Sequence, residues 1–540
     1  MSAGGWRGAL AYSYLVPGKL TNHRAIYNCP DKMHPLRRTF HHRLHPCVAR
    51  CFAVPPDSTA PTNKPPQKIK FNREDSTPDY NAIPTYPPRP SFESFHNPLQ
   101  PLSQTVVYDG APDDPYKPSS TPLYQTSTFQ QPDATSFGKY DYTRSGNPTR
   151  TALEKQMAML EGARAGFAFT SGMAALASMT RLLDNGEEML VCDDVYGGMW
   201  RLLNKVTNRQ GISHRFVDTS NVDAVVAALR PNTRLVHIET PSNPMMKITD
   251  LKALSDELRP RGVLLSVDAT MMSPMMMRPL DLGVDIVVHS GTKFISGHAD
   301  AMGGIMLTRD PTIEQTVAFF QNAEGSALAP FDCWLFLRGI KTLALRVERQ
   351  CANARKVAGY LAAHEAVTTM YWPGKEMLGH PKSGIPDEQI QIHCNQTHLF
   401  EDNGGCSLVS FCTGSEAVSK RFVEACKILK ITVSFGSCNS LVELPTAMSH
   451  ASIDPELCQV PKDLVRISVG IESHIDIIQD IKQALAIAQE ENQSGLLKET
   501  ATVGGTGRVV VEEDEGRYDS KFEELPRTPA VNNTGSTNKE

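Results

Sequence analysis

Residues 262–293 read GVLLSVDATMMSPMMMRPLDLGVDIVVHSGTK, and this stretch decides the fold class. It contains two short apolar runs, VLLSV and DIVVH, separated by a longer segment. Each run is followed at once by polar residues, Asp268 after the first and Ser290-Gly291-Thr292-Lys293 after the second. Such runs predict strands buried on both faces in a parallel sheet, with polar groups at their ends.

The same alternation continues on both sides of this stretch. Further strand-like runs are AGFAFTSG (165–172), EMLVCDD (188–194), TRLVHIET (233–240) and GGIMLT (303–308), with helical patterns such as MAALASMTRLLD (173–184) between them. Strands alternating with helices predict an α/β fold, a mainly parallel sheet with helices on both faces. From residue 341 a long helical pattern introduces a smaller C-terminal α/β domain.

Composition divides the rest of the chain. Residues 1–50 hold eight Lys and Arg against one acid, and eleven of the 38 Pro fall within 51–100. The first pattern fits either a transit peptide or a disordered basic extension. The predicted parts are a basic and then Pro-rich extension (1–95), an N-terminal arm (96–155), a ligand-binding domain (156–340), a C-terminal domain (341–490) with a polar surface insertion (375–403), and a disordered tail (491–540).

Charge and cysteine content exclude several classes of protein. The 540 residues include 54 Lys and Arg against 59 Asp and Glu, a balance that gives no reason to expect nucleic acid or an acidic membrane as partner. All apolar runs are far shorter than the roughly 20 residues of a membrane-spanning helix. The twelve Cys form no CxxC pair, which favours reduced thiols over a disulfide framework or a metal site.

An anion site is predicted where two strands end. Gly172 and Met173 follow the strand-like run AGFAFT and open a helix, so they offer free backbone N–H groups and the positive end of the helix dipole. Ser290 and Thr292 follow the run at 285–289 and offer two hydroxyls. Ligands of open α/β sheets bind beyond the carboxyl ends of the strands, so these groups can meet at one phosphate. Alone, Gly172 would more commonly mark a tight turn.

Two more residues at this edge of the sheet, Asp268 and Lys293, add an acid and an amine to the predicted anion site. Asp268 ends a buried strand, where a carboxylate needs a cationic or N–H partner, and Lys293 supplies a primary amine. Alone, they would be a helix cap or ion pair and a solvated loop lysine. Together with the anion site they predict pyridoxal 5′-phosphate (PLP), which carries a phosphate, a basic ring nitrogen and an aldehyde. Dinucleotide binding fits poorly because no GxGxxG follows the early strands.

Six motifs resemble, in order, those of the Cys/Met metabolism group of PLP-dependent enzymes. They are YDYTRSGNPTRTALE (140–154), FTSGMAAL (169–176), DDVYGG (193–198), ETPSNP (239–244), VDATMMSP (267–274) and HSGTKFISGHAD (289–300). The resemblance covers about residues 103–490 and implies a fold type I PLP-dependent transferase-like architecture. Within the group, residues 321–350 and 434–441 look most like cystathionine β-lyases of the plant and fungal kind.

The resemblance implies roles at the matching positions. Lys293 would bind the cofactor aldehyde covalently and move the Cα proton, and Asp268 would hold the ring nitrogen protonated. Tyr196 would stack on the ring near the substrate amine, and Asn243 would hydrogen-bond its phenolate oxygen. Arg466 would bind the substrate α-carboxylate in the bidentate mode of a guanidinium.

Three further residues are matched in the same way. Tyr142 and Arg144 resemble a pair that reaches the phosphate of a neighbouring subunit, and Ser434 would line the substrate pocket. The resemblance therefore implies a homo-oligomer, a dimer of dimers as in relatives, in which the arm contacts a neighbour.

The expected reaction is the β-elimination of an amino-acid thioether, with L-cystathionine as the substrate. The alternatives are cystathionine γ-lyase and γ-synthase, whose members usually carry an acid where this chain has Asn439. We expect a cytoplasmic enzyme, with mitochondrial import through the basic N-terminal segment as the alternative.

Overall fold

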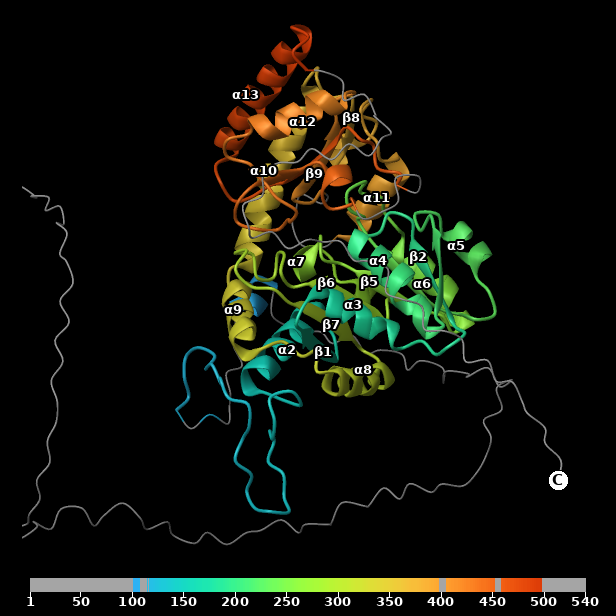
Figure 1. Cartoon of the computed structure of the whole chain (residues 1–540), viewed down its shortest axis with the longest axis vertical. Helices are drawn as coiled ribbons and strands as arrows, with labels where there is room; N and C mark the ends of the chain where they lie inside the picture. Colours follow the sequence, from blue (N-terminus) through green and yellow to red (C-terminus); the bar gives the residue numbers. More distant parts are fainter. Residues whose placement is uncertain (1–100, 107–113, 115, 398–404, 452–457, 498–540) are drawn as a thin grey trace, which may run out of the picture. The chain divides into compact units, whose positions relative to one another are not determined.

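The computed structural model describes residues 101–106, 114, 116–397, 405–451 and 458–497 (Figure 1). The extension expected over 1–95 lies outside these residues, as does the expected disordered tail (491–540) beyond 497. The start of that tail was predicted wrongly, because residues 491–493 end the last helix. The helices are α1 (Pro101–Val106), α2 (Pro148–Glu161), α3 (Gly172–Thr180), α4 (Gly197–Lys205), α5 (Val222–Ala228), α6 (Leu251–Leu258), α7 (Ser273–Met276), α8 (Pro311–Glu324), α9 (Pro330–Ile340), α10 (Leu343–Ala363), α11 (Asp387–Gln396), α12 (Glu416–Ala425) and α13 (His474–Gln493). The strands are β1 (Ala165–Phe169), β2 (Glu188–Cys192), β3 (Ser213–Val217), β4 (Thr233–Glu239), β5 (Leu264–Asp268), β6 (Ile286–Ser290), β7 (Gly304–Thr308), β8 (Thr369–Tyr371), β9 (Leu408–Cys412), β10 (Lys430–Ile431), β11 (Leu441–Glu443) and β12 (Leu464–Ser468).

The first sheet has seven strands in the order β1-β7-β6-β5-β4-β2-β3. The pairs from β6 through β5, β4 and β2 to β3 are parallel, whereas β7 runs antiparallel to both of its neighbours. The sheet is therefore mainly parallel, as predicted. Because β4, β5 and β6 run in one direction, their last residues lie together along one edge.

Helices cover both faces of this sheet, because successive side chains of a strand point to opposite faces. In β6, Ile286 and Val288 belong to an apolar core shared with α3, α4 and α8, whereas Val287 belongs to a second core shared with α2, α6 and α9. Local caps set the helix ends: α2 starts behind the N-cap Asn147 and stops at Gly162, whose φ is 65°. The α/β class with helices on both faces is confirmed.

The second sheet has the order β10-β11-β12-β9-β8, with all neighbours antiparallel except β10 and β11. It is packed with α10, α12 and α13, which Figure 1 shows in yellow, orange and red around it. The apolar core on one face of the first sheet continues through α10 into this second sheet, since Val267, Val357 and Val409 belong to the same cluster.

The polar segment expected as a surface insertion at 375–403 contains α11 within its described part, and that helix is partly buried. Ile390 and His393 of α11 are shielded from solvent. The Gln396 side chain accepts from Leu251 N–H at 2.6 Å and donates to Thr249 O at 3.0 Å, so the segment is tied to the start of α6.

Among the described residues, none forms a helix with the length and apolar character needed to cross a bilayer.

Candidate functional site

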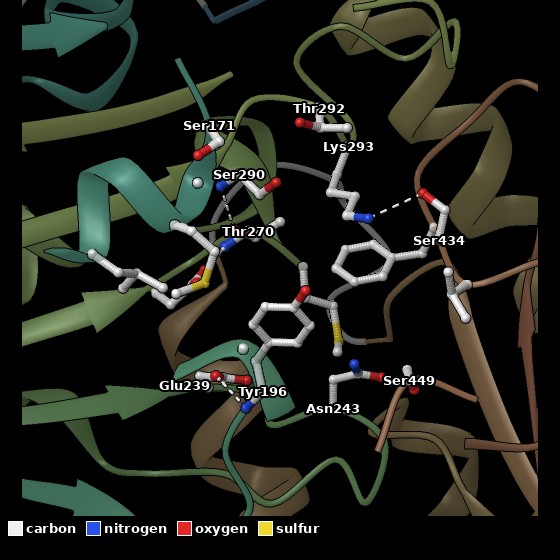
Figure 2. A pocket seen from close by; sticks show the side chains of 18 of the residues that line it. Ser171, Tyr196, Glu239, Asn243, Thr270, Ser290, Thr292, Lys293, Ser434 and Ser449 are labelled. Carbon is white, nitrogen blue, oxygen red and sulfur yellow. Dashed lines mark hydrogen bonds between the residues drawn. The ribbon is translucent and has the colours of Figure 1, made fainter. Parts of the chain in front are cut away.

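A cavity of about 780 Å³ lies where the carboxyl ends of β4, β5 and β6 face the second sheet (Figure 2). The structure brings all the predicted site residues to its wall except Tyr142 and Arg144. The predicted residues that line it are Gly172, Met173, Tyr196, Asn243, Asp268, Ser290, Thr292, Lys293, Ser434 and Arg466.

One end of the cavity is built to hold an anion. The N–H groups of Gly172 and Met173, at the start of α3, have no hydrogen-bond partner within the described part of the chain. A side chain at position 172 would crowd Ser290, because an added Cβ would lie 3.3 Å from its Oγ. Glycine therefore lets the helix start approach the β6 end closely. Thr292 is fixed nearby by its hydroxyl, which accepts from Gly303 N–H at 3.1 Å.

Asp268 is the carboxyl group at the end of β5. Its Oδ1 accepts from Thr270 N–H at 2.9 Å, and Thr270 Oγ1 in turn accepts from Ser290 N–H at 2.7 Å. Burial raises the pKa of Asp268, while Thr270, His289 and Lys293 oppose that rise. This arrangement suits a carboxylate that balances a buried cation.

Lys293 reaches the cavity from the loop after β6. Its Nζ donates to Ser434 Oγ at 3.0 Å and lies 5.1 Å from the centre of the Phe435 ring, so both contacts come from the second sheet's side (Figure 2). Burial, followed by the charge of Arg466, lowers the pKa of Lys293 to about 8. A substantial fraction of the amine is therefore neutral near physiological pH.

Covalent capture of PLP by the apoenzyme is expected to accelerate with pH and to level off near pH 8, because a primary amine attacks an aldehyde only when it is unprotonated. Stopped-flow absorbance after mixing the apoenzyme with PLP measures this rate. An unperturbed lysine would instead keep accelerating toward its usual pKa of about 10.4. A rate that still rises tenfold per pH unit above about pH 9 would contradict the lowered pKa.

Arg466 is buried, and its guanidinium already bonds to groups of its own chain. Its Nη1 lies 2.9 Å from Glu443 Oε1 and donates to Asn243 Oδ1 at 2.9 Å, and its Nη2 donates to Ser434 O at 2.7 Å. Its Nε has no partner within the described residues. No sequence signal pointed to Glu443, which lies opposite Arg466 in the register of β11 and β12. Since Asn243 accepts from Arg466 through its oxygen, its NH₂ group is left to donate elsewhere.

Tyr196 lies at the opposite wall with its side chain 40% exposed. It occupies the N-cap position of α4, and its backbone N–H donates to Glu239 Oε1 at 2.8 Å (Figure 2). Its ring lies over Gly198, where an added Cβ would come within 2.3 Å of the tyrosine Cε1. Glycine at 198 is thus needed for the ring to lie as it does.

Tyr142 and Arg144 do not line the cavity of their own chain. They lie in the extended segment before α2, where the Arg144 guanidinium is 5.2 Å from the centre of the Tyr142 ring and its Nε donates to Asn322 Oδ1 at 3.2 Å. Tyr142 is 43% exposed. The described chain therefore offers these two side chains at its surface.

Arg346 on α10 supports the loop that carries Lys293, and no sequence signal pointed to it. It is buried, and it donates to Phe294 O at 2.7 Å and to Gly339 O at 2.8 Å. An added Cβ at Gly297 would lie only 1.9 Å from its Nη1. Burial lowers the pKa of Arg346 to about 10.

Arg346→Met is expected to lower the free energy of unfolding by about 3 kcal/mol, because it leaves buried carbonyl groups without their charged donor. Urea unfolding of the apoenzyme, followed by circular dichroism, measures this loss. Arg349→Met, on an exposed position of the same helix, is the matched control and should stay within about 0.5 kcal/mol of wild type. Superimposable curves for the two variants would contradict the supporting role.

The residues present fit PLP. The unpartnered N–H groups at the start of α3 and the Ser290 hydroxyl suit a phosphate, the Asp268 carboxyl group suits a protonated ring nitrogen, and the partly neutral amine of Lys293 suits an aldehyde. Within the described ranges, no three His, Cys, Asp or Glu side chains are grouped as metal ligands.

The sequence and the fold of this chain are similar to those of known proteins. Residues 103–486 match the model of the Cys/Met metabolism PLP-dependent enzymes. The chain is 49% identical over 371 residues to a chloroplastic cystathionine β-lyase of Arabidopsis thaliana, covering 68% of this chain and 77% of that protein. It is 44% identical over 369 residues to a cystathionine γ-lyase of Bacillus subtilis, covering 68% and 94%. The crystal structure of a cystathionine γ-lyase from Lactobacillus plantarum, complexed with L-serine, superposes with a TM-score of 0.67 at 36% identity, covering 72% of this chain and all of that one.

Proposed function

Because this chain belongs to the Cys/Met metabolism family of PLP-dependent enzymes, we propose that it is a cystathionine β-lyase. The proposed reaction converts L-cystathionine and water to homocysteine, pyruvate and ammonia. The observation that carries this proposal is the convergence of Lys293, Asp268 and Arg466 on one cavity. Homocysteine is the direct precursor of methionine, so the proposed role is in methionine biosynthesis.

The proposed cofactor contacts follow the chemistry of the cavity wall. The N–H groups of Gly172 and Met173, with Ser290 and Thr292, would hold the phosphate of PLP. Asp268 would pair with the protonated ring nitrogen. When bound, PLP draws electrons from the substrate Cα and so stabilises negative charge there.

The remaining proposed steps belong to this chain's own side chains. Lys293 would take the Cα proton in its neutral form, which its lowered pKa favours. Arg466 would hold the α-carboxylate with Asn243 beside it, and Tyr196 would stack on the ring near the substrate amine. Ser434 accepts from Lys293 Nζ and so would orient the amine toward the substrate.

The choice of β- over γ-elimination is supported by the 49% identity to the plant β-lyase. Asn439 stands where γ-acting members usually carry an acid, but it is exposed and does not line the cavity. The γ-lyase reaction remains the second candidate because of the 44% identity to the Bacillus subtilis γ-lyase.

Incubation of the purified protein with L-cystathionine tests the proposal. Pyruvate with homocysteine is the expected product pair, and 2-oxobutyrate with cysteine would establish the γ-lyase instead. A Lys293→Ala preparation, purified in parallel, controls for contaminating lyases from the host.

We also propose that the enzyme is a dimer of dimers whose Tyr142 and Arg144 complete a neighbour's phosphate site. Support comes from their position outside their own cavity and from the exposure of Tyr142. A twofold interface uses the same patch on both subunits, so each dimer would hold two shared sites.

Co-expression of Lys293→Ala with Arg144→Ala is expected to restore activity that each variant lacks or retains only weakly. In a mixed dimer one site collects both defects, whereas the other takes its lysine from one chain and its arginine from the other. Two different affinity tags isolate the mixed dimer for assay. Isolated mixed dimers with no recovery would mean that Arg144 serves its own chain.

For the compartment, we propose the cytoplasm. Residues 1–95 fused to a fluorescent protein provide the test, and accumulation of the fusion in mitochondria would favour the alternative expectation of import.

A further inference from the structure

Glu239 is a buried acid in the cavity wall with no part in the scheme above. It ends β4, as Asp268 ends β5, and the two residues are paired in the register of these parallel strands. Residues paired in this way point to the same face of a sheet. Both line the cavity, so two carboxyl groups lie side by side in the wall of the proposed PLP site.

The surroundings of the two carboxyl groups differ. Asp268 is faced by Lys293 and His289 and accepts from Thr270 N–H. Glu239 forms no ion pair with any Lys, Arg or His among the residues that the structure describes, and it accepts from Tyr196 N–H at 2.8 Å.

The other titratable groups around Glu239 come from the end of β2. Asp194 faces it, but the Asp194 carboxylate accepts from Ser242 Oγ and from Met245 N–H, and so has other partners. The Cys192 thiol, also near, is buried. No neighbouring group on these elements supplies a positive charge to Glu239.

We propose that Glu239 is a protonated, neutral positioning residue that fixes Tyr196 through its backbone N–H, while Asp268 carries the negative charge of the pair. Two adjacent carboxylates repel each other, and the proton goes to the one without a cationic neighbour. Consistent with this, burial and the charge of Asp268 raise the pKa of Glu239 well above its ordinary value.

The positioning of Tyr196 depends on two contacts. Its own side chain does not cap α4, so the bond to Glu239 anchors its backbone at the first turn. The second is with Gly198, whose lack of a side chain leaves the space that the Tyr196 ring occupies. The inference rests on the proposed function, since it takes the PLP ring to lie against Tyr196.

Glu239→Gln and Glu239→Leu form the test pair. Gln keeps a neutral acceptor for Tyr196 N–H, whereas Leu has a similar size and no acceptor. In the Gln variant we expect the Kd of PLP and the visible circular dichroism of the bound cofactor to stay within about threefold of wild type. In the Leu variant we expect the Kd to rise by about tenfold and the circular dichroism signal to fall by about tenfold. Glu348→Gln and Glu348→Leu, at an exposed position of α10, are the controls.

Two outcomes of this comparison overturn the inference. A Gln variant as damaged as the Leu variant would mean that the negative charge of Glu239 is required, and a Leu variant equal to wild type would mean that the bond positions nothing. If the Leu variant does not fold, as the melting temperature of its apo form would reveal, Glu239→Ala also removes the acceptor of Tyr196 N–H and should produce the same spectral loss; an unchanged spectrum would overturn the inference.

Infrared difference spectroscopy of the holoenzyme observes the proton directly. The wild-type spectrum minus that of Glu239→Gln at neutral pH should contain the C=O stretch of a protonated carboxyl group, since other protonated acids such as Glu154 cancel in the difference. Absence of this band would place the proton elsewhere. These readouts use PLP without substrate. Failure of the proposed function would appear separately, as a wild-type protein that binds PLP but releases no pyruvate from L-cystathionine.

Discussion

Lys293→Ala is expected to lower kcat by at least about 10⁴-fold, because general acid–base catalysis alone contributes about 10²–10⁴ and the covalent hold on the cofactor is lost as well. PLP should still bind through the anion site at the start of α3, which the substitution leaves intact. Single-turnover kinetics with L-cystathionine, together with equilibrium dialysis of PLP, separates the two effects.

The matched control is Lys341→Ala, which removes an exposed lysine next to the C-terminal end of α9. It should leave both kcat and PLP affinity unchanged. Near-normal turnover in Lys293→Ala would remove Lys293 from the mechanism, whereas loss of PLP binding along with activity would show that the anion site is too weak to act alone.

Asp268→Asn is expected to lower kcat by at least about 100-fold, equivalent to about 2.7 kcal/mol, with a change in KM below about threefold. The neutral amide no longer stabilises a positive charge on the ring nitrogen, and that charge matters most in the transition state. Steady-state kinetics over a range of L-cystathionine concentrations gives both constants.

Asp256→Asn, at an exposed position on α6, controls for the loss of one surface charge. A rise in KM with unchanged kcat for Asp268→Asn would assign Asp268 a purely structural role. The Glu239→Gln variant should contrast with it, since the inference above gives Glu239 no charge to lose.

Much of the fold followed from the sequence because the signals are local. Strand-like runs bounded by polar residues predicted β4, β5 and β6, and each ends at or next to the residue that the pattern indicated. The burial of α11 was not foreseen. Its side chains look polar in the sequence, but Gln396 bonds to backbone groups of a segment about 145 residues away.

The candidate site likewise contains residues that the sequence predicted and residues that it did not. Lys293, Asp268 and Gly172 were found because the ends of parallel strands meet at one edge, so sequence position alone predicts their proximity. The same rule also applies to Glu239, the last residue of β4, but the sequence analysis did not predict it as a site residue. The bond between Arg466 and Glu443 was beyond reach, because antiparallel register across 23 residues leaves no local trace.

The continuous core between the two sheets has a consequence for protein supply in the cell. Since one apolar cluster extends from β5 through α10 to β9, the two halves share a large apolar interface and are expected to unfold together. A cofactor that binds only the folded chain then stabilises both halves at once, by an amount that grows with its free concentration. Scarcity of PLP would therefore reduce the abundance of the whole protein through proteolysis, instead of leaving a reserve of idle apoenzyme.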